Sequence, residues 1–71
     1  MMEKYNVHLY DKNDKLLCVD SVLADSYELL NKRVQEKIYV YNKAEYAVIF
    51  KEYKDYKYVA HIKKKFKNDE I

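Results

Sequence analysis

The chain has 71 residues, and its 14 lysine and arginine side chains exceed its 12 aspartates and glutamates by a formal net charge of +2. This length fits a single small domain, which buries only about 60% of the surface that its unfolded chain exposes. So small a charge excess does not favour a strong nucleic-acid binder. No apolar run approaches the ~18 residues of a membrane span and no signal-peptide pattern is present, so we expect a cytoplasmic protein without a membrane partner.

Cysteine, glycine and proline set further limits. The single cysteine, Cys18, excludes an internal disulfide and favours a reducing compartment. A small domain without disulfides often gains stability from a second subunit, so we expect a homodimer. Glycine and proline are absent. Turns therefore have to be built from Asn, Asp and Lys, of which Asn and Asp adopt left-handed backbone at modest cost.

The first predicted elements form a hairpin. Residues Glu3–Tyr10 alternate between an apolar set, Tyr5, Val7 and Leu9, and a polar set, which is the period of a half-buried strand. A polar cluster at residues 11–15 suits a hairpin loop of about three to five residues. The apolar run at residues 16–21 follows as the second strand.

A helix is predicted to begin near Asp25. Asp25 can cap it, and Glu28 lies three residues later, as in a capping box. Asn42 is the expected stop. One apolar stripe recurs at spacings of three and four residues: Tyr27, Leu30, Val34, Ile38 and Tyr41. The β-prone residues 38–41 could instead form a short extra strand, but the stripe continues in phase through them and favours the helix.

Two further strands are predicted at residues 45–53 and 56–66, joined by a turn around Lys54 and Asp55. The first of the two is apolar on both faces and is therefore the expected central strand. Residues 68–71 are expected to be a frayed polar tail. The expected wall of the core consists of Val48, Phe50, Tyr58, Ile62 and Phe66.

The predicted order is β-β-α-β-β. An α+β domain, with one helix packed on an antiparallel four-stranded sheet, is the natural way to bury a single helical stripe. No internal repeat or linker is visible, so residues 1–71 are expected to form one domain.

The sequence shows no catalytic constellation. Ser21 and Ser26 lack the context of a nucleophile elbow or a phosphate loop. Cys18 and a histidine could pair as nucleophile and base, but a cysteine within an apolar strand is expected to be a packed thiol. Cys18, His8 and His61 are too few and too scattered for a metal site. We therefore expect no enzymatic activity, no cofactor, no bound metal and no small-molecule substrate.

The sheet face turned away from the helix is the candidate functional surface. On the predicted register it carries Lys4, Asn6, His8 and Tyr10, then Ala47, Ile49, Lys51 and Tyr53, then Val59, His61, Lys63 and Lys65. Three interpretations stay open. The face could be an ordinary solvated surface, a protein interface, or a platform for single-stranded nucleic acid on which bases stack and lysines attract phosphates.

Nine tyrosines favour the protein interface, because tyrosine supplies rigid contact area with a polar tip. Tyr27 and Tyr58 are expected in the core, and the tyrosines expected to be exposed are Tyr10, Tyr39, Tyr53 and Tyr56. The predicted partner-binding residues are Tyr10, Lys51, Tyr53, His61, Lys63 and Lys65. The lysines among them also have a structural interpretation, since lysines on an exposed edge strand discourage edge-to-edge aggregation. The two histidines become neighbours only if the first and fourth strands are adjacent.

The architecture, the composition and the lack of catalytic residues resemble the small accessory proteins of phages and mobile elements. Many of those proteins bind and block a host protein such as a nuclease or a defence factor. The resemblance implies an inhibitor or regulator of a host bacterial protein, and it assigns no residues. We therefore expect a small protein-binding module, with single-stranded nucleic-acid binding and a structural or assembly role as the alternatives.

Overall fold

The computed structural model describes residues 2–51 and 57–65. It contains strands β1 (Glu3–Tyr10) and β2 (Leu16–Ala24), helix α1 (Tyr27–Val40), and strands β3 (Tyr46–Lys51) and β4 (Lys57–Lys63). The predicted α+β class and β-β-α-β-β order are confirmed. The predicted turn at residues 54 and 55, the tail at residues 68–71, and Tyr53, Tyr56 and Phe66 lie outside the described residues.

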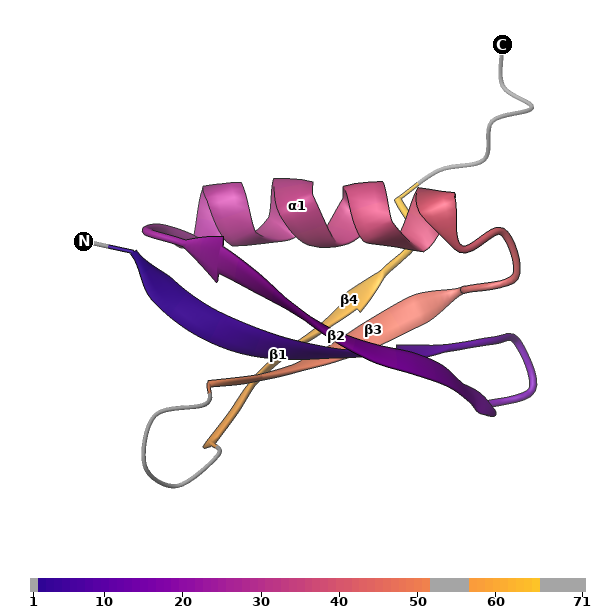
Figure 1. Cartoon of the computed structure of the whole chain (residues 1–71). Coiled ribbons are helices and arrows are strands. Elements are labelled where there is room, and N and C mark those ends of the chain that lie inside the picture. The colour runs from indigo at the N-terminus through magenta and orange to yellow at the C-terminus, as the bar shows by residue number, and fades with distance from the viewer. Residues whose placement is uncertain (1, 52–56, 66–71) are drawn as a thin grey trace, which may run out of the picture.

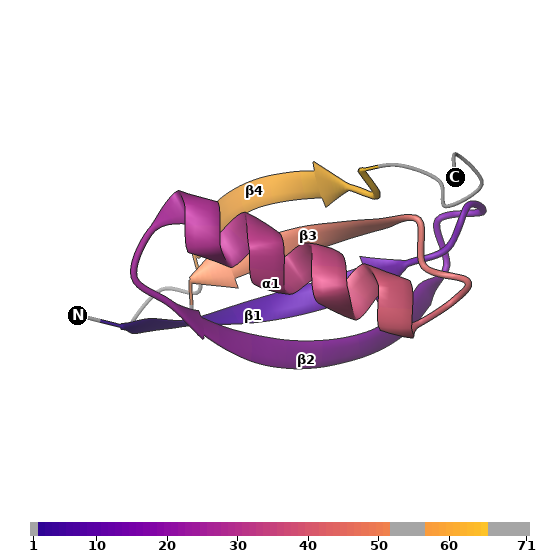
Figure 2. The ribbon, with the colours of Figure 1, turned by 90° about the horizontal axis from the view of Figure 1, so that it is seen from above.

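The four strands form one antiparallel sheet in the order β2-β1-β3-β4. β1 pairs with both β2 and β3, so the helix connects two strands that run in the same direction with β1 between them. Figure 2 shows α1 running diagonally across the sheet, and Figure 1 shows it over one face. β3 is central, as its two apolar faces predict, and β2 and β4 are the edges.

The loop of the first hairpin is organised by Asp11. Its Oδ1 accepts the backbone N–H groups of Asn13 and Lys15 at 2.8 and 2.9 Å. The Lys15 N–H, and to a smaller extent the Asn13 N–H, lowers the pKa of the Asp11 carboxyl because both bonds favour its charged form. Asp14 follows with a φ of 64°. It takes the left-handed conformation that glycine usually supplies, as expected for a chain without glycine.

The core lies between α1 and the inner face of the sheet. Leu30, Val34 and Ile38 form the buried stripe of the helix. They pack over side chains from all four strands: Val7, Leu9, Val22, Ala24, Ala47, Ile49 and Ile62. Because protein interiors are close-packed, the alanines in this set show that little space separates the helix from the sheet.

The helix begins one residue later than predicted. Ser26, not Asp25, is the N-cap, and its Oγ accepts the Leu29 backbone N–H at 3.2 Å. The helix continues to Val40, so an extra strand at residues 38–41 is excluded, and Tyr41 rather than Asn42 is the C-cap. β2 continues to Ala24, past its predicted end at residue 21. Both ends of the predicted helical stripe, Tyr27 and Tyr41, are exposed, so the prediction that Tyr27 lies in the core is wrong.

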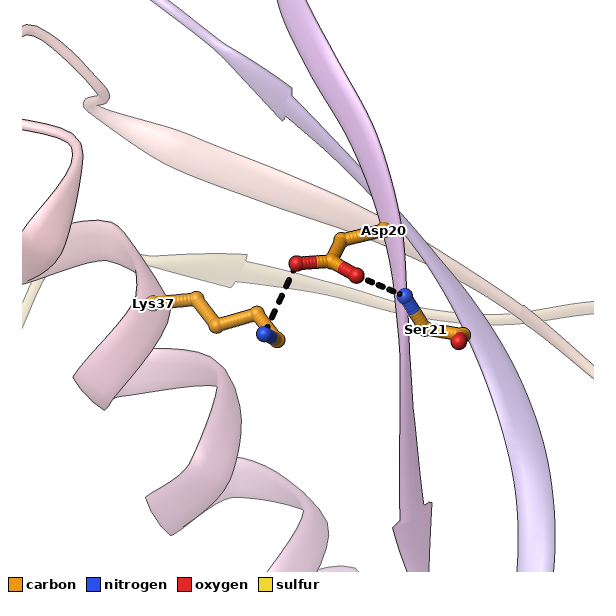
Figure 3. A network of polar contacts seen from close by, with 3 residues as sticks. All are labelled: Asp20, Ser21 and Lys37. Atoms are coloured by element: carbon orange, nitrogen blue, oxygen red, sulfur yellow. Dashed lines mark hydrogen bonds and ion pairs between the residues drawn. The ribbon is translucent and has the colours of Figure 1, made fainter.

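Polar contacts attach the helix to both edges of the sheet. Lys37 Nζ lies 2.8 Å from Asp20 Oδ2 on β2, and the Ser21 N–H donates to Oδ1 of the same carboxylate (Figure 3). On the β4 side, Gln35 Nε2 donates to the carbonyl of Lys63 at 2.8 Å. These contacts hold α1 in its diagonal path across the sheet.

β3 faces the opposite way from the prediction. Ala47 and Ile49 are fully buried beneath the helix. Tyr46, Val48 and Phe50 therefore lie on the face turned away from it, because neighbouring strand residues point to opposite faces. The space between the helix and the sheet is narrow. It accommodates the small and aliphatic side chains of β3, so the aromatic side chains lie on the other face.

A bulge alters the register of β4. Ile49 pairs with Ala60, but Phe50 pairs with Tyr58, so Val59 is the extra residue. The bulge turns Tyr58 to the outside, where it is 58% exposed. The predicted core wall is therefore wrong at Val48, Phe50 and Tyr58, and among its described members Ile62 alone is buried.

Candidate protein-binding face

The outer face is the sheet surface turned away from α1, and no described element covers it (Figure 1). The register and the alternation along each strand define its members. They are Lys4, Asn6, His8 and Tyr10 of β1; Val19, Ser21 and Leu23 of β2; Tyr46, Val48 and Phe50 of β3; and Tyr58, His61 and Lys63 of β4.

One group of rings on this face is centred on Tyr46. The Tyr46 ring is stacked on Tyr10, with centroids 5.1 Å apart and an interplanar angle of 11°. On its other side it lies 4.7 Å from the His61 ring, tilted by 42°. The group therefore extends from β1 across β3 to β4. Ring pairs of this kind contribute about 0.5–1.5 kcal/mol beyond the area that they bury.

A second group is centred on Phe50. Its ring centroid is 5.0 Å from that of His8 on β1 and 6.1 Å from that of Tyr58 on β4, the latter in an edge-on arrangement. Both groups thus cross the same strands, from β1 to β4. Rings that contact one another in this way are ordered before any partner arrives, because each restricts the rotamers of its neighbour.

Tyr46 is also fixed at its polar end. Its hydroxyl donates to Asp14 Oδ1 at 2.8 Å. This hydrogen bond, and secondarily burial, raises the pKa of Tyr46 above its ordinary value of 10.0. The Tyr46 hydroxyl is therefore neutral at physiological pH, and the loop of the first hairpin is joined to the edge of the outer face.

The charged strand positions of the outer face have one sign, and the Asp14 carboxylate lies at its edge beside the Tyr46 hydroxyl. Lys4 and Lys63 are its charged members, and none of its positions carries a carboxylate. The next lysine, Lys64, is directed elsewhere, since its Nζ lies 5.5 Å from the centre of the Tyr39 ring on α1. The outer face therefore favours contact with an acidic surface.

Three of the predicted partner-binding residues lie together on this face. Tyr10 and His61 both contact the Tyr46 ring. Lys63 pairs with Tyr46 in the register of β3 and β4. Tyr10 is half-buried, whereas His61 and Lys63 are exposed.

The other described members of the predicted site are Lys51 and Lys65. Lys51 is on the helix side of the sheet, where its Nζ lies 2.7 Å from Glu3 Oε1, and this contact raises the pKa of Lys51. Lys65 follows β4, and its backbone N–H donates to Gln35 Oε1 on the helix at 3.0 Å. Lys51 is therefore not a member of the outer face, and its predicted placement there is wrong. Lys65 lies beyond the last residue of β4, so its place on the outer face stays a prediction. Tyr53 lies outside the described residues.

Phe50 and Tyr58 were predicted to lie in the core, but they lie on the outer face together with Tyr46, which the prediction did not name. Alternation alone could not orient β3, because both of its faces are apolar. A usable signal was the matching of aliphatic side chains across strands: Ala47 pairs with Ile62, and Ile49 pairs with Ala60. Ala47 and Ile49 are aliphatic, like the buried residues of β1. The aromatic residues of β3 therefore lie on the other face.

The histidines and the cysteine are separated by the sheet. His8 and His61 both pair with Val48, from opposite sides of β3, so they are two strand spacings apart, about 10 Å. Cys18 lies on the helix side of β2 and packs against the core, the face opposite to His8. The thiol raises the pKa of the neighbouring Tyr41 hydroxyl through a hydrogen bond. This arrangement does not pair Cys18 with His8 as nucleophile and base.

The described residues hold no group of three or more His, Cys, Asp or Glu side chains that could bind a metal ion. Within the same residues, no helix is both long enough and apolar enough to cross a membrane. No protein family model, curated protein or solved structure matches the chain. The function is therefore argued from the geometry and charge of the outer face.

Proposed function

We propose that the chain is a non-enzymatic protein-binding module and that the outer face engages its partner. The observation that carries this proposal is the uncovered row of rings. A sheet usually buries an apolar face against another layer, yet no described element lies over the outer face (Figure 1), which carries Tyr46, Phe50 and Tyr58. Aromatic side chains of this kind are enriched at protein interfaces.

The order of these rings supports the proposal energetically. Binding usually costs about 0.5–1.5 kcal/mol for each side chain that loses its rotamers at the interface. Tyr46 is held by two ring contacts and by the bond to Asp14, and Phe50 is held by ring contacts on both sides. Much of this rotamer freedom is therefore already lost in the free domain, before a partner binds.

The charge of the face indicates the chemistry of the partner. Lys4 and Lys63 border the rings on the strands at either side of β3. The complementary surface is an apolar patch bordered by carboxylates. An inhibitor that imitates the phosphates of nucleic acid would instead need carboxylates on this face. The target surface that we propose is therefore acidic. It belongs to a host bacterial protein, such as a nuclease or a defence factor, and the module inhibits or regulates that protein.

The proposal is tested by affinity capture from a bacterial lysate treated with nuclease, followed by titration of the purified captured protein. Tyr58→Ala is expected to weaken binding about 30-fold, the effect of a hot-spot residue. Lys63→Glu is also expected to weaken binding, and this loss of affinity should grow as the salt concentration is lowered. Tyr27→Ala and Lys32→Glu on α1 are matched controls, since Tyr27 is 60% exposed and Tyr58 is 58% exposed. Equal affinity for all four variants would contradict the proposal.

Single-stranded nucleic acid is the second candidate, favoured by one specific observation. Rings on three neighbouring strands of an open sheet can stack on successive bases, and Lys63 provides a phosphate contact at one end. Binding of labelled mixed-sequence oligonucleotides should then fall steeply as salt rises from about 50 to about 200 mM, because counterions are released. No mobility shift at low salt would remove this candidate.

A further inference from the structure

The two edges of the sheet differ in how they are protected. β4 carries Lys57 and Lys63 at its ends, and two more lysines follow it. Lysines on an edge strand oppose pairing with another strand. β2 carries no lysine or arginine, and its one charged residue, Asp20, is paired with Lys37 of α1. Within the described chain β2 pairs with β1 alone, so its other edge presents backbone N–H and C=O groups to solvent.

Exposed aliphatic side chains gather at this same edge. Among the described residues, the exposed large aliphatic side chains are Met2, Leu16, Val19, Leu23 and Val40, and the other exposed large hydrophobic residues are tyrosines. Leu16, Val19 and Leu23 belong to β2. Met2, Leu23 and Val40 line a groove of about 780 Å³ between α1 and β2. Val40 is 75% exposed although it ends the helix beside the core. Contiguous exposed apolar surface of this kind marks an interaction site.

Two of the charged residues beside the groove, Arg33 and Glu36, are self-complementary; the others are Lys4 and Lys37, and Lys37 is paired with Asp20. Arg33 and Glu36, one turn apart on α1, both line it and are both exposed. A two-fold axis makes each copy present the same surface to the other. Arg33 of one copy can then meet Glu36 of the other, and the reverse. This complementarity favours a second copy of the chain over an unrelated strand.

We propose that β2 pairs antiparallel with β2 of a second copy, which joins the two sheets into one continuous sheet. The two-fold axis stands perpendicular to the sheet, so both helices lie on the same side and Val40 of each copy fills the space between them. The aliphatic side chains of the edge leave water, and the outer-edge backbone groups of β2 gain partners. Val19 and Leu23 belong to both the dimer edge and the outer face, whereas Tyr46, Phe50 and Tyr58 lie on β3 and β4 and stay accessible in the dimer.

The mass in solution tests the proposal on the full chain. Sedimentation from about 1 μM to about 1 mM should show a dimer, and hydrogen exchange should show that β2 amides become more protected as concentration rises. Val19→Lys gives β2 the protection that β4 already has, and it should raise the dissociation constant at least about tenfold. Tyr58→Lys on β4 is the matched control and should leave the dimer intact. A monomer throughout, or a dimer that Val19→Lys does not weaken, overturns the proposal.

A charge exchange tests the two-fold contact itself. Arg33→Glu places carboxylates against carboxylates across the axis and should weaken the dimer. Adding Glu36→Arg to the same chain restores opposite charges in both contacts and should recover the wild-type dissociation constant. Circular dichroism of each variant confirms that the fold is retained. If the double variant dimerises as weakly as Arg33→Glu alone, the proposed arrangement is wrong.

Discussion

Lys37 Nζ on α1 lies 2.8 Å from Asp20 Oδ2 on β2, so the C-terminal half of the helix is joined to an edge strand by an ion pair (Figure 3). The Ser21 backbone N–H donates to the other carboxylate oxygen at 2.8 Å and fixes its orientation. The bond from Lys37, and next the bond from Ser21, lowers the pKa of Asp20 below its ordinary value of 3.8. The pair also neutralises the one charge on β2.

This pair predicts a pH-dependent part of the stability. Asp20→Asn should lower the free energy of unfolding at pH 7 by about 0.5–1 kcal/mol, because partly exposed ion pairs contribute little more. The folded-state pKa of Asp20 is the lower one, so the stabilisation is complete above the unfolded value near 3.8 and is lost as pH falls through the folded value. Urea unfolding of both proteins at pH 7 and at about pH 2 should give a difference that disappears in acid.

A double-mutant cycle supplies the control for this prediction. Lys37→Met removes the partner and keeps most of the side chain's length. If the pair accounts for the stabilisation, the loss in Asp20→Asn/Lys37→Met is smaller than the sum of the single losses. Strictly additive losses would show that the two side chains stabilise the fold separately.

Asp14 combines two roles that can be separated. Its φ of 64° is compatible with glycine, whereas alanine pays about 1–2 kcal/mol for the left-handed conformation. Asp14→Ala should therefore unfold at a lower urea concentration than Asp14→Gly. Equal midpoints would mean that the loop changes conformation to relieve the strain.

The second role of Asp14 concerns Tyr46. The raised pKa of Tyr46 means that its hydroxyl bond stabilises the fold below the ordinary value of 10.0 and is lost as pH rises through the folded value. Both Asp14→Gly and Asp14→Ala should return the Tyr46 pKa toward 10.0, measured from the NMR shift of its ring carbons. Lys12→Ala in the same loop is the control. A pKa that stays raised in both Asp14 variants would point to burial as the dominant cause.

The helix cap gives a prediction with a neighbouring control. Ser26→Ala should destabilise the protein by about 1 kcal/mol, because the Leu29 N–H loses its acceptor. Asp25→Ala, one residue earlier, should cost much less. Thermal unfolding of the two variants decides between the observed cap and the one predicted from the capping-box spacing. The reverse order would place the helix start at Asp25.

The sequence predicted the elements whose patterns are one-sided. β1 has its predicted bounds because Val7 and Leu9 alternate with polar residues, and this alternation placed Tyr10 on the outer face. Ile62 was correctly predicted to be buried. Alternation along β4 therefore placed its neighbours, His61 and Lys63, on the outer face. The apolar stripe likewise predicted the helix, although the capping residue was displaced by one, because Asp25 and Ser26 are both good N-caps.

The remaining errors come from distances between layers, which a one-dimensional pattern does not contain. Both faces of β3 are apolar, so its orientation depends on whether rings or aliphatic side chains fit beneath the helix. The bulge opposite Ile49 and Phe50 then changes which β4 residues face outward. With the faces exchanged, Phe50 moved from the predicted core to the candidate binding face, while Lys51 moved to the helix side and pairs with Glu3.

The orientation of β3 is open to a direct test. Ile49 is fully buried and Phe50 only partly so. Ile49→Ala should therefore lower the free energy of unfolding by about 2–5 kcal/mol, the cost of deleting a buried aliphatic side chain and leaving a cavity. Phe50→Ala removes a larger side chain but should cost less, because its ring was never fully withdrawn from water. The same Phe50→Ala protein should lose affinity for the captured partner, whereas Ile49→Ala, measured where it is still folded, should retain it. A larger loss of stability from Phe50→Ala than from Ile49→Ala would mean that the rings face the helix.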